Sequence, residues 1–87
     1  MRYTVIWTSL ALNELAEVWT ESTDRDAVTK ASRVLDGRLE RDPLNEGESR
    51  SGPNRITFEH PLRVEFRVFP DRLLVEVLSL GDITRHA

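Results

Sequence analysis

The side chains best suited to phosphate chemistry lie in the second half of the chain. An arginine guanidinium binds a phosphate through paired hydrogen bonds and stabilises negative charge that develops on it. A glutamate or histidine beside it can act as general base or general acid. The candidates are, for catalysis, Arg63, Glu65, Arg85 and His86 and, for nucleic-acid binding, Arg55 and Arg67.

A structural role for the same residues is the competing interpretation. Arg63 and an acid such as Glu59 can form an ordinary cross-strand pair on a solvated sheet face, which contributes only tenths of a kcal/mol. His86 lies one residue from the end of the sequence, where residues are poorly ordered by default. His60 precedes Pro61 and suits a hairpin turn. The residue types alone leave both interpretations open.

Several kinds of chemistry are absent from the sequence. The chain has no cysteine, so a disulfide framework and thiolate chemistry are excluded. It contains no glycine-rich phosphate loop and no metal-ligand spacing, because its two histidines are far apart. We therefore expect no metal and no cofactor. No run approaches the ~18 apolar residues of a membrane span, and Met1–Trp7 does not resemble a signal peptide, so we expect a cytoplasmic protein without a membrane partner.

The charge balance argues against a general attraction to nucleic acid. The 87 residues carry 12 basic and 15 acidic side chains, for a net charge of −3. All the basic residues except Lys30 are arginines. The acidic excess lies in residues 1–46, whereas residues 47–87 are neutral, so any contact with a polyanion should involve the second half.

Periodicity predicts one small α+β domain over residues 1–87 with the order β-α-α-β-β-β. Alternating residues predict a strand over 2–7, and apolar residues at helical spacing predict helices over about 9–22 and 25–41. Residues 42–53 are turn formers without periodicity and are expected to form a loop. The last segments predict strands over 54–60, 62–69 and 72–80. We expect an antiparallel meander with the helical hairpin packed on one face.

The apolar pattern also predicts the register of the last three strands. An odd-numbered turn at 60–62 pairs Phe58 with Val64, whereas a two-residue turn would set Phe58 opposite Arg63 and mix the two faces. The expected core comprises Trp7, Leu15, Val18, Val28, Leu35, Phe58, Val64, Phe66, Val75 and Val77. The opposite, open face then carries Arg63, Glu65 and Arg67 beside exposed leucines, and we expect a protein partner to bind Leu74, Leu78 and Leu80.

In its order of motifs, the chain resembles the RelE/ParE toxin superfamily of type II toxin–antitoxin systems, which includes plasmid stabilisation proteins. The similarity covers nearly the whole chain. It lies in the strand Tyr3–Trp7, the helix segment Glu14–Trp19, the loop containing Asp42–Pro43 and Gly47–Glu48, and the strands Pro61–Val68 and Leu73–Leu80.

The resemblance implies a compact sheet with two helices and a cognate antitoxin encoded by a neighbouring gene. RelE-type members cleave mRNA on the ribosome without a metal, and ParE-type members poison DNA gyrase. By position, Arg63 matches the strand arginine of the RNase branch and Arg55 its phosphate-contacting residues. Arg85 and His86 lie near its C-terminal catalytic cluster.

Departures from the RNase branch favour the ParE-type or non-toxic alternative, although the Arg63 strand motif also fits the RNase branch. Many RNase toxins have a C-terminal tyrosine and a run of basic residues after the last strand. This sequence has no counterpart of the tyrosine, it has Gly81–Thr84 in place of the basic run, and its net charge is negative. We therefore expect a toxin-like protein that is gyrase-directed or has lost its toxicity. The alternative is a metal-independent endoribonuclease that acts on mRNA at the ribosome.

Overall fold

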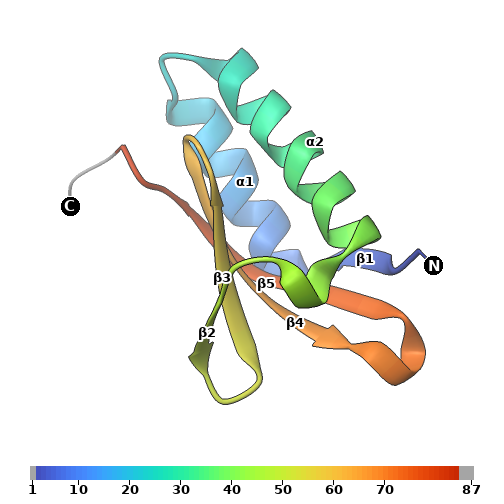
Figure 1. Ribbon diagram of the computed structural model, residues 1–87. Helices are drawn as coiled ribbons and strands as arrows, with labels where there is room; N and C mark the ends of the chain where they lie inside the picture. The colour runs from blue at the N-terminus through green and yellow to red at the C-terminus, as the bar shows by residue number, and fades with distance from the viewer. Residues whose placement is uncertain (1, 85–87) are drawn as a thin grey trace.

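The computed structural model describes residues 2–84, which form two helices and a five-stranded sheet (Figure 1). The elements are β1 (Thr4–Trp7), α1 (Ser9–Glu21), α2 (Arg25–Arg41), the short 3-10 turn η1 (Pro43–Asn45), β2 (Glu48–Ser51), β3 (Asn54–Glu59), β4 (Leu62–Phe69), the 3-10 turn η2 (Pro70–Arg72) and β5 (Leu74–Asp82). The α+β class and the helical hairpin packed on the sheet are confirmed.

Local capping explains where both helices begin and end. The Thr8 side chain accepts a hydrogen bond from the Ala11 amide at the start of α1, and Asp24 accepts one from Ala27 at the start of α2. These bonds satisfy amides that have no partner within the helix. Pro43 follows α2 directly after Asp42 and ends it, because the residue before a proline is disfavoured in the helical region.

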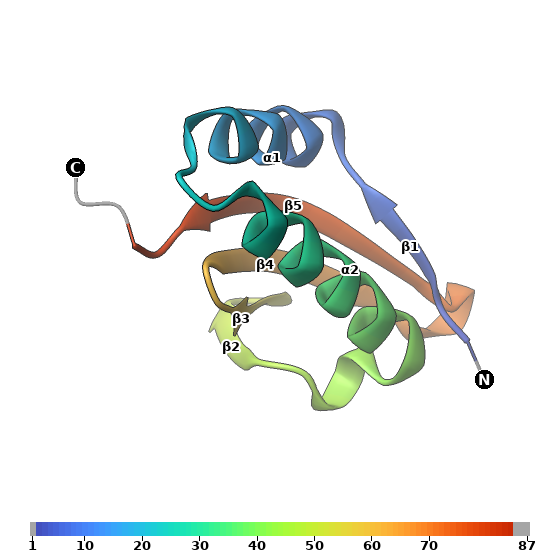
Figure 2. The same ribbon diagram turned by 90° about the horizontal axis from the view of Figure 1, so that it is seen from above.

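The sheet is mixed, with the strand order β1-β5-β4-β3-β2. The strands from β2 to β5 pair antiparallel, as the meander prediction requires. The first strand, β1, pairs with β5 in the parallel direction, and Figure 2 shows the two side by side. The sequence analysis predicted the antiparallel meander but not this parallel pair, in which the first strand joins the edge of the sheet beside β5.

One strand lies within the segment that the sequence predicted as a loop. Residues 43–45 form η1, and Glu48–Ser51 form β2 against β3. This edge strand has no apolar alternation, because Glu48 and Ser49 are exposed and contribute no side chain to the core. The periodic pattern that marks a half-buried strand is therefore missing from it.

The register between β3 and β4 differs by one residue from the prediction. Phe58 pairs with Arg63 and Thr57 with Val64, so the turn consists of the two residues His60 and Pro61. Phe58 is 52% exposed on the open face, whereas Thr57 is only 5% exposed on the helix side. The prediction failed because it assumed that the larger apolar residue must face the core.

A β-bulge accounts for a second correction, at the end of β5. Phe66 pairs with Val77 and Glu65 with Ser79, so Leu78 is an extra residue with no partner on β4. A bulge changes the face on which the following residues lie. Leu80 is consequently 3% exposed in the core and not on the open face.

The core lies between the helices and the three strands β1, β4 and β5. Its buried apolar residues are Ala11, Val18, Val28, Ala31, Leu35, Leu39, Leu62, Val64, Phe66, Val75, Val77 and Leu80. Trp7 and Leu15, which were predicted to be core residues, are partly buried and pack against this cluster. Among the described residues, no helix is long and apolar enough to cross a membrane.

Candidate functional site

The middle strand, β4, presents the candidate catalytic residues on the sheet face away from the helices. Arg63, Glu65 and Arg67 alternate with the buried Val64 and Phe66, so all three point to the open face. The sequence therefore predicted correctly that these three side chains share a face.

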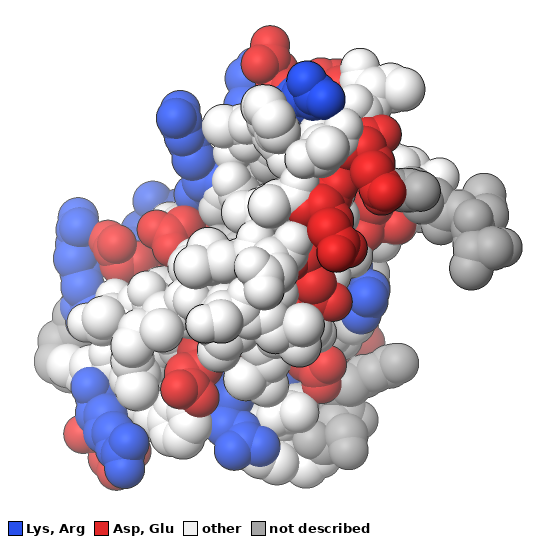
Figure 3. Space-filling model, turned by 180° about the vertical axis from the view of Figure 1, so that it is seen from behind, with Lys and Arg blue, Asp and Glu red and all other residues white. Residues whose placement is uncertain are grey.

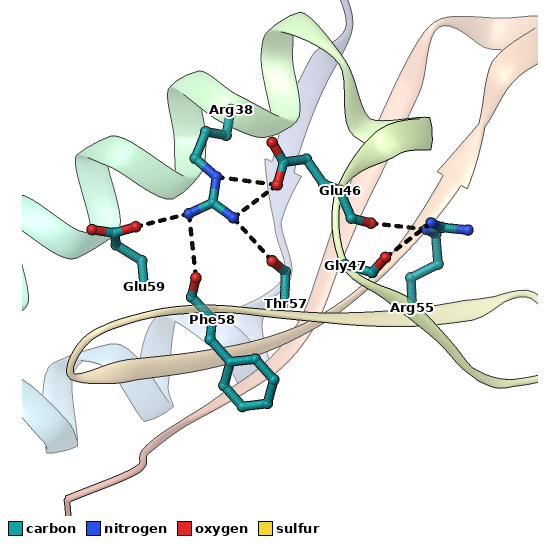
Figure 4. Close-up of polar contacts among 7 residues, drawn as sticks. All are labelled: Arg38, Glu46, Gly47, Arg55, Thr57, Phe58 and Glu59. Atoms are coloured by element: carbon teal, nitrogen blue, oxygen red, sulfur yellow. Dashed lines mark hydrogen bonds and ion pairs between the residues drawn. The ribbon is translucent and has the colours of Figure 1, made fainter.

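Arg55 lies on the opposite face of the sheet. It pairs with the buried Phe66, and directly opposite residues of antiparallel strands share a face. Its guanidinium donates hydrogen bonds to the backbone carbonyls of Glu46 (3.1 Å) and Gly47 (3.3 Å), as Figure 4 shows. Arg55 therefore holds β2 and the loop before it, and the one-residue register difference separates it from Arg63 and Arg67.

The open face already supplies partners to Glu65 and Arg67. Asn54 donates to one carboxylate oxygen of Glu65 (3.1 Å), and Ser79 lies 3.5 Å from the other. The Arg67 Nε donates to the side-chain oxygen of Asn54 (3.1 Å), and its guanidinium lies 6.0 Å from the Phe69 ring centroid. Asn54 thus links Glu65 to Arg67 in a small structural network.

Arg63 is the exception on this face, because its side chain makes no hydrogen bond or ion pair with any residue that the structure describes. Its partner on β5 is Gly81, where an added Cβ would lie only 2.8 Å from the Arg63 Nη2. Its partner on β3 is the exposed Phe58. A free guanidinium beside an exposed ring can bind a phosphate and stack a base.

The remaining predicted site residues are only partly accounted for. Arg85 and His86 lie outside the described residues. Leu74 pairs with Phe69 and is partly exposed, and Leu78 is the partly exposed bulge residue. Leu80 is buried and cannot contact a partner. Within residues 2–84, no group of three or more His, Cys, Asp or Glu side chains could hold a metal ion.

The densest polar cluster of the molecule surrounds Arg38 on α2 (Figure 4). Its Nε and Nη2 both donate to one Glu46 carboxylate oxygen, at 3.1 and 2.7 Å, and its Nη1 donates to Glu59 at 2.8 Å. Further bonds reach the Thr57 hydroxyl (3.0 Å) and the Phe58 carbonyl (3.2 Å). This arginine therefore fastens α2 to β3 and to the loop before β2.

Hydrogen bonding to Glu46 raises the pKa of Arg38 above its usual value. Burial acts in the opposite direction, while the negative charges of Glu46 and Glu59 raise the pKa further. Arg38 is thus a permanently charged structural residue. The sequence analysis overlooked it, although its position three residues after the buried Leu35 marks the core side of the helix.

An apolar groove runs between α1 and α2 on the outer side of the hairpin. It consists of two adjoining hollows of about 410 and 470 Å³, which share Leu12, Leu15 and Ser32 as lining residues. Trp7 and Gly37 line one end, and Trp19 lines the other end. Leu12 (52%) and Trp19 (43%) are well exposed, so this face holds more accessible apolar surface than the sequence analysis assigned to the helices.

Comparison with solved structures identifies the class of fold. The chain matches a structure of the Mycobacterium tuberculosis RelBE2 toxin–antitoxin complex over 94% of its length and 92% of that chain, with a TM-score of 0.74 and 20% identity. It matches a structure of the chromosomal ParDE system of P. aeruginosa over 93% of its length and 96% of that chain, with a TM-score of 0.72 and 16% identity.

A third match is a structure of the E. coli toxin RelE in its free state, in a variant with two arginines replaced by alanine. It covers 94% of this chain and 84% of that chain, with a TM-score of 0.69 and 19% identity. No protein-family model and no curated protein matches the sequence. The chain has the fold of the RelE/ParE toxins, which confirms the resemblance seen in its motifs.

Proposed function

We propose that this protein is the toxin-like component of a type II toxin–antitoxin system and is neutralised by a cognate antitoxin in the cytoplasm. The supporting observation is the fold match over more than nine tenths of both chains to proteins of the RelBE2 and ParDE toxin–antitoxin complexes.

The proposed activity is gyrase-directed, as in ParE-type toxins, or lost. In-line cleavage of RNA needs groups that move protons beside the group that stabilises the phosphate. On the open face, Glu65 already accepts hydrogen bonds from Asn54 and Ser79, and Arg63 has no described acid or base bonded to it. The net charge of −3 also provides no long-range attraction to ribosomal RNA.

A metal-independent, ribosome-dependent mRNA endonuclease is the second candidate. One specific observation favours it, namely the free guanidinium of Arg63 between the exposed Phe58 and Gly81. In this mechanism Arg63 stabilises the charge on the phosphorane. Glu65 or His86 then moves the protons, for which Glu65 must exchange its present hydrogen bonds.

The antitoxin is proposed to cover the open face through Leu74 and Leu78, with its acidic side chains against Arg63 and Arg67. Partly exposed leucines ringed by charges suit the apolar centre and polar rim of an interface. Leu74→Asp and Leu78→Asp should then weaken co-purification with the product of the neighbouring gene. Full-strength binding by variants with unchanged circular dichroism would show that the antitoxin binds elsewhere.

The decisive experiment is induced expression of this chain without the neighbouring gene, with growth, translation and DNA supercoiling followed together. Growth arrest with gyrase–DNA adducts supports a gyrase-directed toxin, and Arg63→Ala should leave that toxicity nearly unchanged. Absence of any growth defect supports a member without toxicity. Codon-phased mRNA cuts that disappear in Arg63→Ala would establish the endonuclease and overturn the first proposal.

A further inference from the structure

The outer face of the α1–α2 hairpin is mainly apolar along its centre, where Arg33 and Asp36 also line one hollow, and charged along its flanks. Leu12 lines both hollows of the groove and is still 52% exposed, and Trp19 is 43% exposed at one end. Contiguous apolar surface rimmed by polar residues is typical of protein–protein contact sites.

The floor of this groove also contains a glycine that the fold itself does not require. Gly37 lies in the middle of α2, where glycine costs about 1 kcal/mol relative to alanine. The only heavy atom within 4 Å of an added Cβ would be the Arg41 Nη2, at 3.9 Å. Because no packing inside the chain demands its absence, the missing side chain serves to keep the groove open beside Trp7 and Leu12.

The two helices carry charges of opposite sign on their exposed sides. Glu17 and Glu21 lie on the exposed side of α1, whereas Glu14 accepts a hydrogen bond from the Leu80 amide of β5 (3.0 Å). Lys30 and Arg41 lie on the exposed side of α2, where Asp26 is the exposed acidic residue. Figure 3 shows acidic side chains in a row on one side of an uncharged area, and basic side chains with a few acidic ones among them on the other. The side chains of Glu17, Lys30 and Arg33 make no hydrogen bond or ion pair within the described part of the chain.

These charges occur at matching levels along the hairpin. Leu15 and Ala16 line the same hollow as Thr29 and Ser32, so the middle of α1 lies beside the first half of α2. Glu17 and Lys30 therefore stand at about the same height on opposite flanks. Two such surfaces can therefore face each other with opposite charges in contact, provided that a two-fold axis of the right direction relates them.

From this pattern we infer that the α1–α2 face binds a second copy of the same chain and forms a symmetric four-helix contact. A two-fold axis parallel to the helices places α1 of each copy against α2 of the other. Each Glu17 then meets Lys30 of the partner on the flank. Leu12 and Trp19 of each copy fill the hollows of the other at the centre.

The charge pattern selects this arrangement over its alternatives. A two-fold axis perpendicular to the helices would stack α1 on α1 and bring like charges together, which is unfavourable. An unrelated helix would have to carry a complementary pair of charged flanks, whereas a second copy supplies both flanks by symmetry. The inference is independent of the proposed function, because it concerns a face opposite to Arg63.

The test is sedimentation velocity of the purified protein over a wide concentration range, with wild type and charge variants compared. Glu17→Lys changes two symmetric contacts from attraction to repulsion and should weaken the dimer roughly tenfold or more. Lys30→Glu should have a similar effect, and the double variant Glu17→Lys/Lys30→Glu should regain most of the wild-type affinity. Asp71→Lys, an exposed charge reversal in η2 far from the hairpin, is the matched control and should not change the affinity.

A second variant tests the apolar centre of the face. Leu12→Asp should abolish the dimer and leave the circular dichroism spectrum unchanged, because Leu12 is already half exposed. A wild-type protein that remains monomeric at all concentrations would overturn the inference, as would a dimer that survives Leu12→Asp. A monomer whose antitoxin binding is lost in Glu17→Lys and Leu12→Asp would assign the groove to the antitoxin instead.

Discussion

Two arginines show how a single side-chain type takes different roles according to its neighbours. Arg38 is surrounded by Glu46, Glu59 and two oxygens of β3, and its side chain is only 25% exposed. Arg63 lies on an open sheet face, and among the described residues it has no bonded partner. A partly buried polar group that makes its hydrogen bonds stabilises the fold. A surface guanidinium without hydrogen-bond partners is available to bind a ligand.

Replacing Arg38 tests the structural role at the residue scale. Arg38→Met should lower the free energy of unfolding by about 2 kcal/mol, because it leaves two partly buried carboxylates without their hydrogen bonds. The matched control is Arg2→Met, since Arg2 forms an ion pair with Glu40 at 2.7 Å but its side chain is 82% exposed. That change should cost less than about 0.5 kcal/mol. Urea unfolding measures both, and equal effects would refute the special role of Arg38.

Two glycines in the β2 region provide a second residue-scale test. Gly47 (φ 67°) and Gly52 (φ 56°) both adopt the left-handed conformation that other residues avoid. An alanine Cβ at Gly47 would lie 2.1 Å from the Ile56 carbonyl oxygen, whereas at Gly52 it would contact nothing within 4 Å. Gly52→Ala should therefore cost about 1 kcal/mol and Gly47→Ala about 3 kcal/mol or more. If the two melting temperatures fall equally, the close backbone contact at Gly47 is wrong.

At the scale of elements, the sequence was sufficient wherever burial gave a simple period. Both helices, β1 and the last three strands were predicted with errors of a residue or two, because their apolar residues repeat at 3.6 or 2 positions. The prediction failed where a polar residue is buried and an apolar residue is exposed. Thr57 faces the helices because Arg38 binds its hydroxyl, and Phe58 is left exposed.

The bulge in β5 was equally hidden from a pattern analysis. In the sequence, apolar and polar residues of β5 give no sign that Leu78 is an extra residue. Only the pairing with β4 reveals that Ser79 and Leu80 have changed face. The candidate site was consequently predicted in part. Arg63, Glu65 and Arg67 depend on β4 alone and share a face as expected, whereas Arg55 and Leu80 depend on the register of neighbouring strands.

Two phenylalanines on adjacent strands test the register directly. Phe66 is fully buried on β4, so Phe66→Ala should cost about 3–5 kcal/mol, which is much of the stability of a small domain. Phe58 is 52% exposed on β3, and Phe58→Ala should cost about 1 kcal/mol. Thermal unfolding of the two variants compares them. A loss at Phe58 as large as the loss at Phe66 would place both rings in the core, as the odd-numbered turn requires, and would contradict the observed pairing.

At the scale of the whole molecule, charge is divided among three surfaces. The open sheet face has Arg63 and Arg67 beside Glu65 and Glu76, the flank of α1 is acidic, and the exposed side of α2 is basic. The negative total therefore conceals local regions of both signs. Binding of nucleic acid to the open face should draw mainly on Arg63 and Arg67, with Arg72 at the edge of the face against the Phe69 ring.

This division gives a quantitative expectation for nucleic-acid binding. If only Arg63 and Arg67 contact phosphates, the logarithm of the affinity for single-stranded RNA should fall with the logarithm of salt concentration with a slope of about −1.4. Fluorescence anisotropy of a labelled oligonucleotide measures this slope. Arg63→Ala should reduce its magnitude by roughly half, because it removes one of two phosphate contacts. Arg33→Ala, on the helical face away from the sheet, should leave the slope unchanged. A wild-type slope steeper than about −3 would require a further basic surface and would strengthen the case for an mRNA-directed activity.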